Sequence, residues 1–202
     1  TMAGIDVLQR LINSVGGSVM LGFNRRHWQP VLQLQKIISN ETNDQVSAQL
    51  VMVSNVRKWS SIETKSDPLE DLGSHQFDLL RFIFKREILT ISARWTGPDA
   101  LHMRVKLTGG AVADCRVSFD SFSEEVLSFQ TSKRKYRIHA GSDRTTPTNG
   151  MRYVLDLSDA LIRKVRSRKI SILTSYGRQL RTFFDYVRSG IKTQPDLKDG
   201  IA

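Results

Sequence analysis

A short segment of the chain brings two carboxylates and an imidazole together. Asp71, His75 and Asp78 are spaced by four and three residues, so on a helix or its first turn their side chains share one face. A carboxylate beside an imidazole is the pair with which an enzyme moves a proton to or from a substrate hydroxyl. The spacing therefore indicates proton-transfer chemistry, carried by His75 and Asp71.

The same residues also have an interpretation without catalysis. Asp71 can cap the helix, and Asp78 can pair with Arg81. Histidines with perturbed surroundings are often structural rather than catalytic. The spacing alone leaves both interpretations open, and no pattern in the sequence predicts a metal site.

The elements that must hold this segment follow from the spacing of apolar residues. Helical spacing predicts helices over 5–15, from Pro30 to Ile38, from about Ser74, around 161–165 and over 180–187. Gly16 and Gly17 end the first helix, and a short buried strand is expected over 18–23. Residues 60–70 are polar, and Pro68 argues against helix there.

Apolar and polar residues alternate after residue 87, as in strands with one buried and one polar face. Together with an apolar segment over 45–56, the predicted strands are 89–95, 101–107, 111–119, 126–130 and 135–139. Gly109 and Gly110 predict a two-residue hairpin turn. We therefore expect an α+β domain, in which an open antiparallel β-sheet carries helices on one face.

The first 23 residues do not continue this sheet. A helix, a glycine pair and a buried strand are typical of the closing helix–strand unit of a doubly wound nucleotide-binding domain. No glycine-rich phosphate loop lies between a strand and a following helix, so we expect no dinucleotide to bind this chain alone. We predict two parts: residues 1–23 as the remnant of a Rossmann-like domain, and residues 24–202 as the α+β domain.

Positive charge is concentrated in the last third of the chain. The 202 residues carry a formal net charge of +10; residues 1–130 hold 14 basic and 14 acidic side chains, and residues 131–202 hold 16 and 6. Two basic runs, residues 133–137 and 163–169, carry much of this excess. Clustered cations attract polyanions, but neither run is flanked by the aromatic platforms that single-strand binders use. No apolar run is long enough to span a bilayer. We expect a cytoplasmic chain, with neither a membrane nor nucleic acid as its favoured partner.

Four stretches, taken in order, resemble one enzyme family. They are residues 19–26 ahead of a helix with Pro30, the segment with Asp71, His75 and Asp78, the antiparallel sheet, and residues 183–190. Their order and separations resemble the Gfo/Idh/MocA family of NAD(P)-dependent oxidoreductases, which mostly act on sugars, inositols and related polyols. The likeness begins at the last helix and strand of that family's Rossmann domain. The family's phosphate loop and its Glu-Lys-Pro segment would precede Thr1.

The resemblance implies a function for the chain within a longer enzyme. NAD or NADP in the complete enzyme would take a hydride from a secondary alcohol, and His75, oriented by Asp71, would take the hydroxyl proton. Four further residues would line the cleft where cofactor and sugar or polyol substrate meet: Asn24, Arg25, Arg26 and Asp78. The missing N-terminal nucleotide-binding domain would be a partner of the chain, and the open sheet face would join copies into a homo-oligomer.

Two other functions are compatible with the sequence. In the first, residues 131–202 form a non-catalytic basic module that docks on nucleic acid or an acidic partner. Binding that weakens steeply with added salt would favour this function. In the second, the chain is a catalytically inactive relative of the oxidoreductases. The sequence identifies neither the substrate nor the choice between NAD and NADP.

Overall fold

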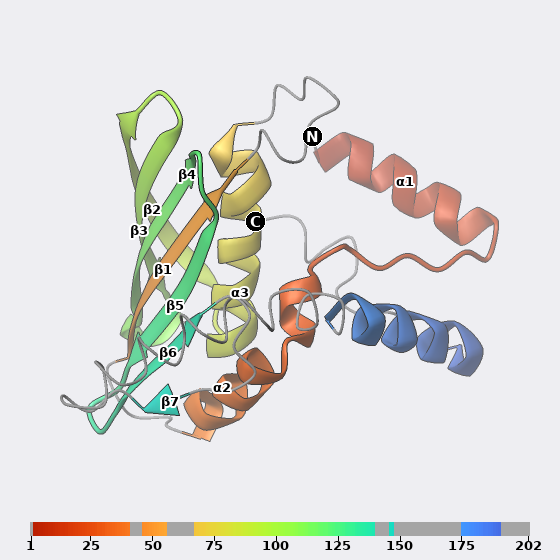
Figure 1. Ribbon diagram of the computed structural model, residues 1–202. Coiled ribbons are helices and arrows are strands. Elements are labelled where there is room, and N and C mark those ends of the chain that lie inside the picture. Colours follow the sequence, from red (N-terminus) through yellow and green to blue (C-terminus); the bar gives the residue numbers. More distant parts are fainter. Residues whose placement is uncertain (1, 41–45, 56–66, 140–145, 148–174, 191–202) are drawn as a thin grey trace.

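The described residues form an open seven-stranded β-sheet with helices packed on one face, shown as a computed structural model in Figure 1. The structure describes residues 2–40, 46–55, 67–139, 146–147 and 175–190. The strands are β1 (Ser47–Ser54), β2 (Ile88–Gly97), β3 (Ala100–Leu107), β4 (Val112–Phe119), β5 (Glu124–Gln130), β6 (Lys135–His139) and β7 (Thr146–Pro147). Helices α2 (Gln29–Asn40) and α3 (Ser74–Phe84) cover the sheet. The predicted α+β class is confirmed.

One pair of strands departs from the predicted antiparallel meander. The strand order is β2-β3-β4-β1-β5-β6-β7, and β1 runs parallel to β4 while the other neighbours are antiparallel. The chain leaves β1 through α3 and returns through the β2–β3 hairpin before it forms β4. A crossover of this length permits a parallel pair. The sheet is therefore mixed at the β1–β4 pair.

The predicted glycine turn joins β3 to β4, with one residue more than expected. Residues Thr108–Gly110 form a three-residue turn, closed by the Leu107 N–H, which donates to the Ala111 carbonyl at 2.9 Å. Gly109 and Gly110 have φ values of 72° and 83°. Glycine adopts this left-handed conformation without the steric cost of a side chain.

The hydrophobic core lies between the sheet and the two covering helices. Its fully buried side chains include Leu34, Leu50, Leu79, Leu80, Ile83, Leu101, Met103, Leu127 and Phe129. Cys115 is also buried there, and burial, with a smaller effect of Asp114, raises the pKa of its thiol to about 12. A buried thiol with so high a pKa is a poor nucleophile.

The front of the chain confirms the predicted helix and corrects the predicted strand. Helix α1 (Met2–Ser14) matches the expectation, but residues 17–23 have no regular secondary structure. Within the described residues no strand lies beside 18–23, so its backbone has no partner for a ladder. Figure 1 shows the segment running between α1 and a helix over residues 175–189, on the side away from the sheet.

The helix with His75 begins earlier than predicted. Residues Leu69–Gly73 form a π-helical turn that continues into α3, and Pro68 precedes this turn with a φ of −59°. The expectation that Pro68 excludes helix is wrong, because proline fits the first turn, where its missing N–H would have no partner. π-helical turns are frequent at functional sites. The helix predicted around 161–165 lies outside the described residues, and no described helix is long and apolar enough to cross a membrane.

Candidate functional site

His75 lies in the first turn of α3, where its imidazole packs edge-on against the ring of Phe23, with ring centroids 5.7 Å apart. Its Nδ1 atom is buried and has no hydrogen-bond partner within the described part of the chain. Burial, and after it the charge of Arg25, lowers the pKa of His75 from 6.5 to about 3. The imidazole is therefore neutral at physiological pH, which is the form that a general base requires.

Arg25 supplies the positive charge next to His75. It lies on the short 3-10 turn η1 (Asn24–His27), and its Nε and Nη2 donate to the Glu125 carboxylate at 2.6 and 3.1 Å. Burial alone would lower the pKa of Arg25, but Glu125, with smaller contributions from Tyr176 and Asp71, raises it above its ordinary value. Arg25 therefore remains a cation and disfavours a protonated His75.

Asp71 is exposed in the π-helical turn. Its N–H donates to the Asp67 carbonyl at 3.2 Å, and its own carbonyl accepts from the Ser74 hydroxyl at 3.3 Å. The structure records no hydrogen bond between the Asp71 carboxylate and His75, whose Nδ1 is unpartnered within the described residues. The charge of Asp71 acts on Arg25 instead. The two predicted catalytic residues are near each other in sequence, but the structure does not pair them.

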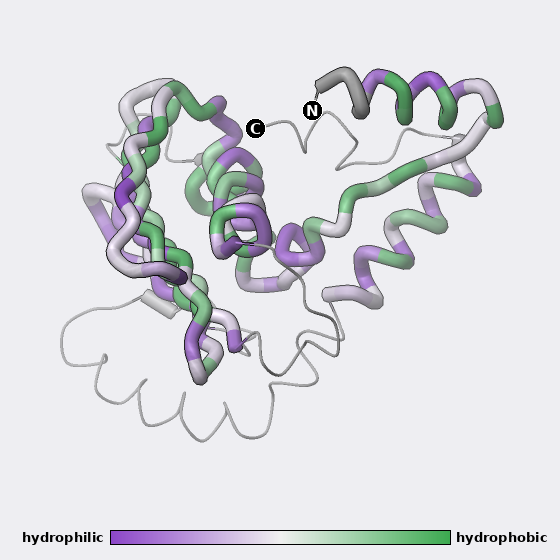
Figure 2. Tube along the Cα trace, turned by 90° about the horizontal axis from the view of Figure 1, so that it is seen from above, coloured by the Kyte–Doolittle hydropathy of each residue, from purple (hydrophilic) through white to green (hydrophobic). Residues whose placement is uncertain are grey.

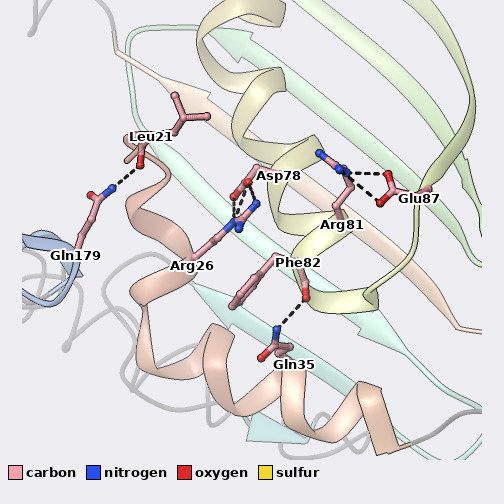
Figure 3. Close-up of polar contacts among 8 residues, drawn as sticks. All are labelled: Leu21, Arg26, Gln35, Asp78, Arg81, Phe82, Glu87 and Gln179. Carbon is pink, nitrogen blue, oxygen red and sulfur yellow. Dashed lines mark hydrogen bonds and ion pairs between the residues drawn. The ribbon is translucent and has the colours of Figure 1, made fainter. Parts of the chain in front are cut away.

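Asp78 is bound by Arg26, as Figure 3 shows. Arg26 Nε donates to both carboxylate oxygens, at 2.9 and 3.0 Å, and its Nη2 donates to one of them at 2.5 Å. The guanidinium also lies over the ring of Phe82, 5.2 Å from its centroid. Arg81, the partner suggested by sequence, forms an ion pair with Glu87. Asp78 therefore fastens η1 to α3.

The helix over 175–189 binds the backbone of η1 and of the segment just before it. Gln179 Nε2 donates to the Leu21 carbonyl at 2.7 Å, and Arg178 Nη1 donates to the His27 carbonyl at 3.3 Å. These contacts join two segments that lie about 150 residues apart in the chain. They fix the backbone of the segment that carries the buried Asn24 and the two arginines.

Glu125 is the site residue that sequence analysis missed. It lies on the core-facing side of β5 with Leu127 and Phe129, which are 0% and 1% exposed. An acidic residue in a row of core-facing positions needs a cation beside it, because an unpaired buried charge is costly. The alternating sequence of residues 125–129 places Glu125 on the same side of the strand as two apolar residues, and this pattern could have identified it. The sequence around Gln179 carried no comparable signal.

The assembled site offers a neutral imidazole and two arginines that carboxylates already hold. Glu125 binds Arg25 and Asp78 binds Arg26, so a cofactor phosphate near either guanidinium would share it with a carboxylate. Among the described residues no group of three His, Cys, Asp or Glu side chains could hold a metal ion. The described geometry offers, at His75, a neutral imidazole whose Nδ1 has no hydrogen-bond partner among the described residues.

Little of the alternative basic surface falls within the described residues. Lys133, Arg134 and Lys135 are exposed at the turn between β5 and β6, and Arg137 is partly buried. The second basic run, residues 163–169, lies outside the described part. Arg178, Arg181 and Arg188 are exposed on the helix over 175–189. The alternative basic module stays a prediction.

The fold is that of a class of solved oxidoreductases. No family model matches the chain, and no curated protein matches it. A probable dehydrogenase from Thermotoga maritima is 16% identical with a TM-score of 0.70, and the match covers 99% of this chain and 63% of that one. Myo-inositol 2-dehydrogenase from Lactobacillus plantarum is 15% identical with a TM-score of 0.72, and the match covers 100% of this chain and 64% of that one. An oxidoreductase from Agrobacterium radiobacter in complex with NAD+, L-tartaric acid and magnesium is 15% identical with a TM-score of 0.70, with the same two coverages of 100% and 64%.

The chain thus spans just under two thirds of the length of each of these proteins. A likeness at this level of identity establishes the fold alone. It confirms the fold expected from the resemblance to the Gfo/Idh/MocA family.

Proposed function

We propose that the chain is the C-terminal part of an NAD(P)-dependent oxidoreductase that acts on a sugar, an inositol or a related polyol. In this role it binds substrate and carries the proton-transfer residue, His75. The observation that carries the proposal is the fold, which is shared over the whole chain with longer dehydrogenases, one of them a myo-inositol 2-dehydrogenase. The neutral state of His75 supports the assigned role, because only an unprotonated imidazole can take a proton.

Exposed apolar faces on two helices support a neighbouring nucleotide-binding half. Helix α1 and the residue after it expose Val7, Leu8, Leu11 and Val15, and the helix over 175–189 exposes Tyr176, Leu180, Phe184 and Val187. These spacings place each set on one side of its helix. Figures 1 and 2 show both helices projecting beside the segment 15–23. In the proposal, a Rossmann-like sheet covers both faces and pairs with residues 18–23.

The proton-transfer residue needs its surroundings to change when substrate is bound. The nicotinamide of bound NAD(P) would supply hydride chemistry, and His75 would take the hydroxyl proton. In the structure burial, and after it the charge of Arg25, lowers the pKa of His75 and keeps it a weak base. We propose that Asp71 becomes the partner of the unpaired Nδ1 in the assembled site, which raises the basicity of His75 and orients the ring.

The test uses the protein as its gene encodes it, including any segment that precedes this chain. We expect reduction of NAD or NADP with at least one inositol or sugar, measured by absorbance of the reduced coenzyme. His75→Asn should lower kcat by roughly 10²- to 10⁴-fold and leave coenzyme affinity unchanged. The matched control is His102→Asn, because His102 is an exposed histidine on the open sheet face.

Two outcomes would count against the proposal. A protein that binds the coenzyme but turns over no polyol would remove the oxidoreductase function. Full activity of the His75→Asn protein would remove the role of His75 and leave the fold assignment unchanged.

A further inference from the structure

Strand β2 forms an open edge of the sheet. It is the terminal strand, and within the described residues it pairs only with β3. All residues from Leu89 to Thr96 are exposed. The outer edge of such a strand presents N–H and C=O groups that can pair with another strand. The backbone of β2 is therefore accessible along most of its length.

The side chains of β2 extend the apolar layer of the core beyond its helical cover. Ile91 and Trp95 lie opposite Val105 and Leu101 of β3, and hence on the face that the helices cover. Val105 and Leu101 are 0% and 1% exposed, whereas Ile91 and Trp95 are 44% and 48% exposed. The helices thus cover β3 and leave the apolar residues of β2 uncovered.

The two edges of the sheet differ in how they resist pairing. Within the described residues the far edge is β7, which consists of Thr146 and Pro147. A short strand with a proline is a poor template, because proline has no N–H to donate. Strand β2 contains no proline and only one charged residue, Arg94. Its register shifts lie near its ends, so residues 90–95 pair regularly with β3. The usual protection of an edge strand is therefore weak at β2.

We propose that β2 pairs antiparallel with β2 of a second copy of this chain, so that one sheet runs across a two-fold axis at Ala93. In this register Ile91 lies opposite the partner's Trp95, a β-branched and aromatic pair of the kind that stabilises adjacent strands. Arg94 lies opposite the partner's Ser92, so no like charges meet. Because a two-fold contact uses the same edge in both copies, assembly stops at two copies.

The open face of the sheet is a less suitable contact for a second copy. Around Asp114, the exposed side chains on this face of β2, β3 and β4 include Arg94, Arg104, Lys106 and Arg116. Two such faces brought together would oppose like charges, which costs free energy. The homo-oligomer through this face stays a prediction. Edge pairing avoids the conflict and should strengthen with added salt, because salt screens the repulsion between two chains of net charge +10.

Sedimentation of the 202-residue chain over a dilution series tests the proposal. A single pair of strands buries less than the roughly 1,200 Å² of a typical stable complex, so we expect a monomer–dimer equilibrium in the micromolar range. Ile91→Lys should weaken the dimer at least about tenfold, the effect of some 1.4 kcal/mol. Leu180→Lys, a similar change at an exposed apolar residue on the helix over 175–189, should leave the dimer unchanged.

Arg104→Glu separates the edge from the open face. We expect this substitution to leave the dimer intact. A monomer at every concentration, a series of species larger than two, or a dimer that responds to Arg104→Glu and not to Ile91→Lys would overturn the proposal.

Cross-linking tests the register directly. At the two-fold axis, Ala93→Cys brings two thiols from opposite strands within the 4.4–6.8 Å Cα separation that a disulfide requires. Thr90→Cys is the matched control, because in this register the two substituted positions lie about 20 Å apart. We expect a covalent dimer on oxidation of the first variant only; Cys115 is buried and should not react. Equal cross-linking of both variants would contradict the register.

Discussion

Two regions of this molecule differ in how far they expose their apolar side chains. The body, which comprises the sheet with α2 and α3, buries most of its large apolar side chains in one core, except those of the edge strand β2. Its carboxylates Glu125 and Asp78 hold Arg25 and Arg26 in ion pairs. The lateral helices, α1 and residues 175–189, expose their apolar side chains, and Figure 2 shows hydrophobic residues recurring along both. The body therefore has the features of a structure that is stable on its own, whereas the lateral helices have those of a docking surface. Substitutions of one kind in both regions can test this difference.

The largest effect is expected in the body, at the ion pair between Asp78 and Arg26. Their side chains are only 1% and 11% exposed, and removing one partner of a buried pair leaves the other charge without compensation. We expect Asp78→Ala to lower the free energy of unfolding by about 3–5 kcal/mol. Urea denaturation followed by circular dichroism measures this loss.

The matched control is the exposed ion pair on the same helix. Arg81 and Glu87 are 3.1 Å apart, but the Glu87 side chain is 72% exposed. Pairs of this kind contribute about 0–1 kcal/mol, so Glu87→Ala should change stability little. Equal losses for Asp78→Ala and Glu87→Ala would show that burial does not distinguish the two pairs.

The second-largest effect is a pH dependence of stability at His75, which packs against Phe23 of the segment between the lateral helices. The pKa of His75 is about 3 in the folded chain, whereas its ordinary value of 6.5 applies to the unfolded chain. Below pH 6.5 the unfolded chain therefore binds a proton at His75 more readily than the folded chain does. His75 therefore imposes no loss of stability above pH 6.5, and stability falls by roughly 1.4 kcal/mol per pH unit as the pH drops toward 3.

His75→Asn removes this dependence on pH. Between pH 6.5 and 5, the wild-type chain should lose about 2 kcal/mol more than the variant. Unfolding in urea at several pH values gives both slopes. If the slopes agree, the imidazole is as easily protonated in the folded chain as in the unfolded one, and the burial argument for a neutral His75 is wrong.

Local patterns predicted most of the elements, because helical and strand spacing depend only on neighbouring residues. The helix at 5–15 and the alternating strands of the body were found in this way. The place of β1 between β4 and β5 was not, since it depends on how the chain returns after α3. The strand over 18–23 was predicted wrongly, because an apolar segment becomes a strand only where another strand is available to pair with it.

The site was predicted in part for the same reason. The sequence singled out Asp71, His75 and Asp78 by a spacing of three and four residues, but the partner of Asp78 is Arg26, 52 residues away. Spacing along one helix cannot show a contact with a distant turn. Glu125 was within reach of a pattern argument, since it interrupts a core-facing row of apolar residues.

The smallest effect is expected in the lateral helices. Leu80 in the body is 0% exposed and Leu11 in α1 is 58% exposed, so the same substitution probes both regions. Leu80→Ala should cost about 2–5 kcal/mol, because it leaves a cavity. Leu11→Ala should cost less than about 0.5 kcal/mol in this chain, since surface substitutions rarely exceed that value. In the protein that also contains a nucleotide-binding half, we expect the cost of Leu11→Ala to rise, because the leucine then becomes buried. An unchanged cost there would mean that the exposed face of α1 is not the surface on which that half docks.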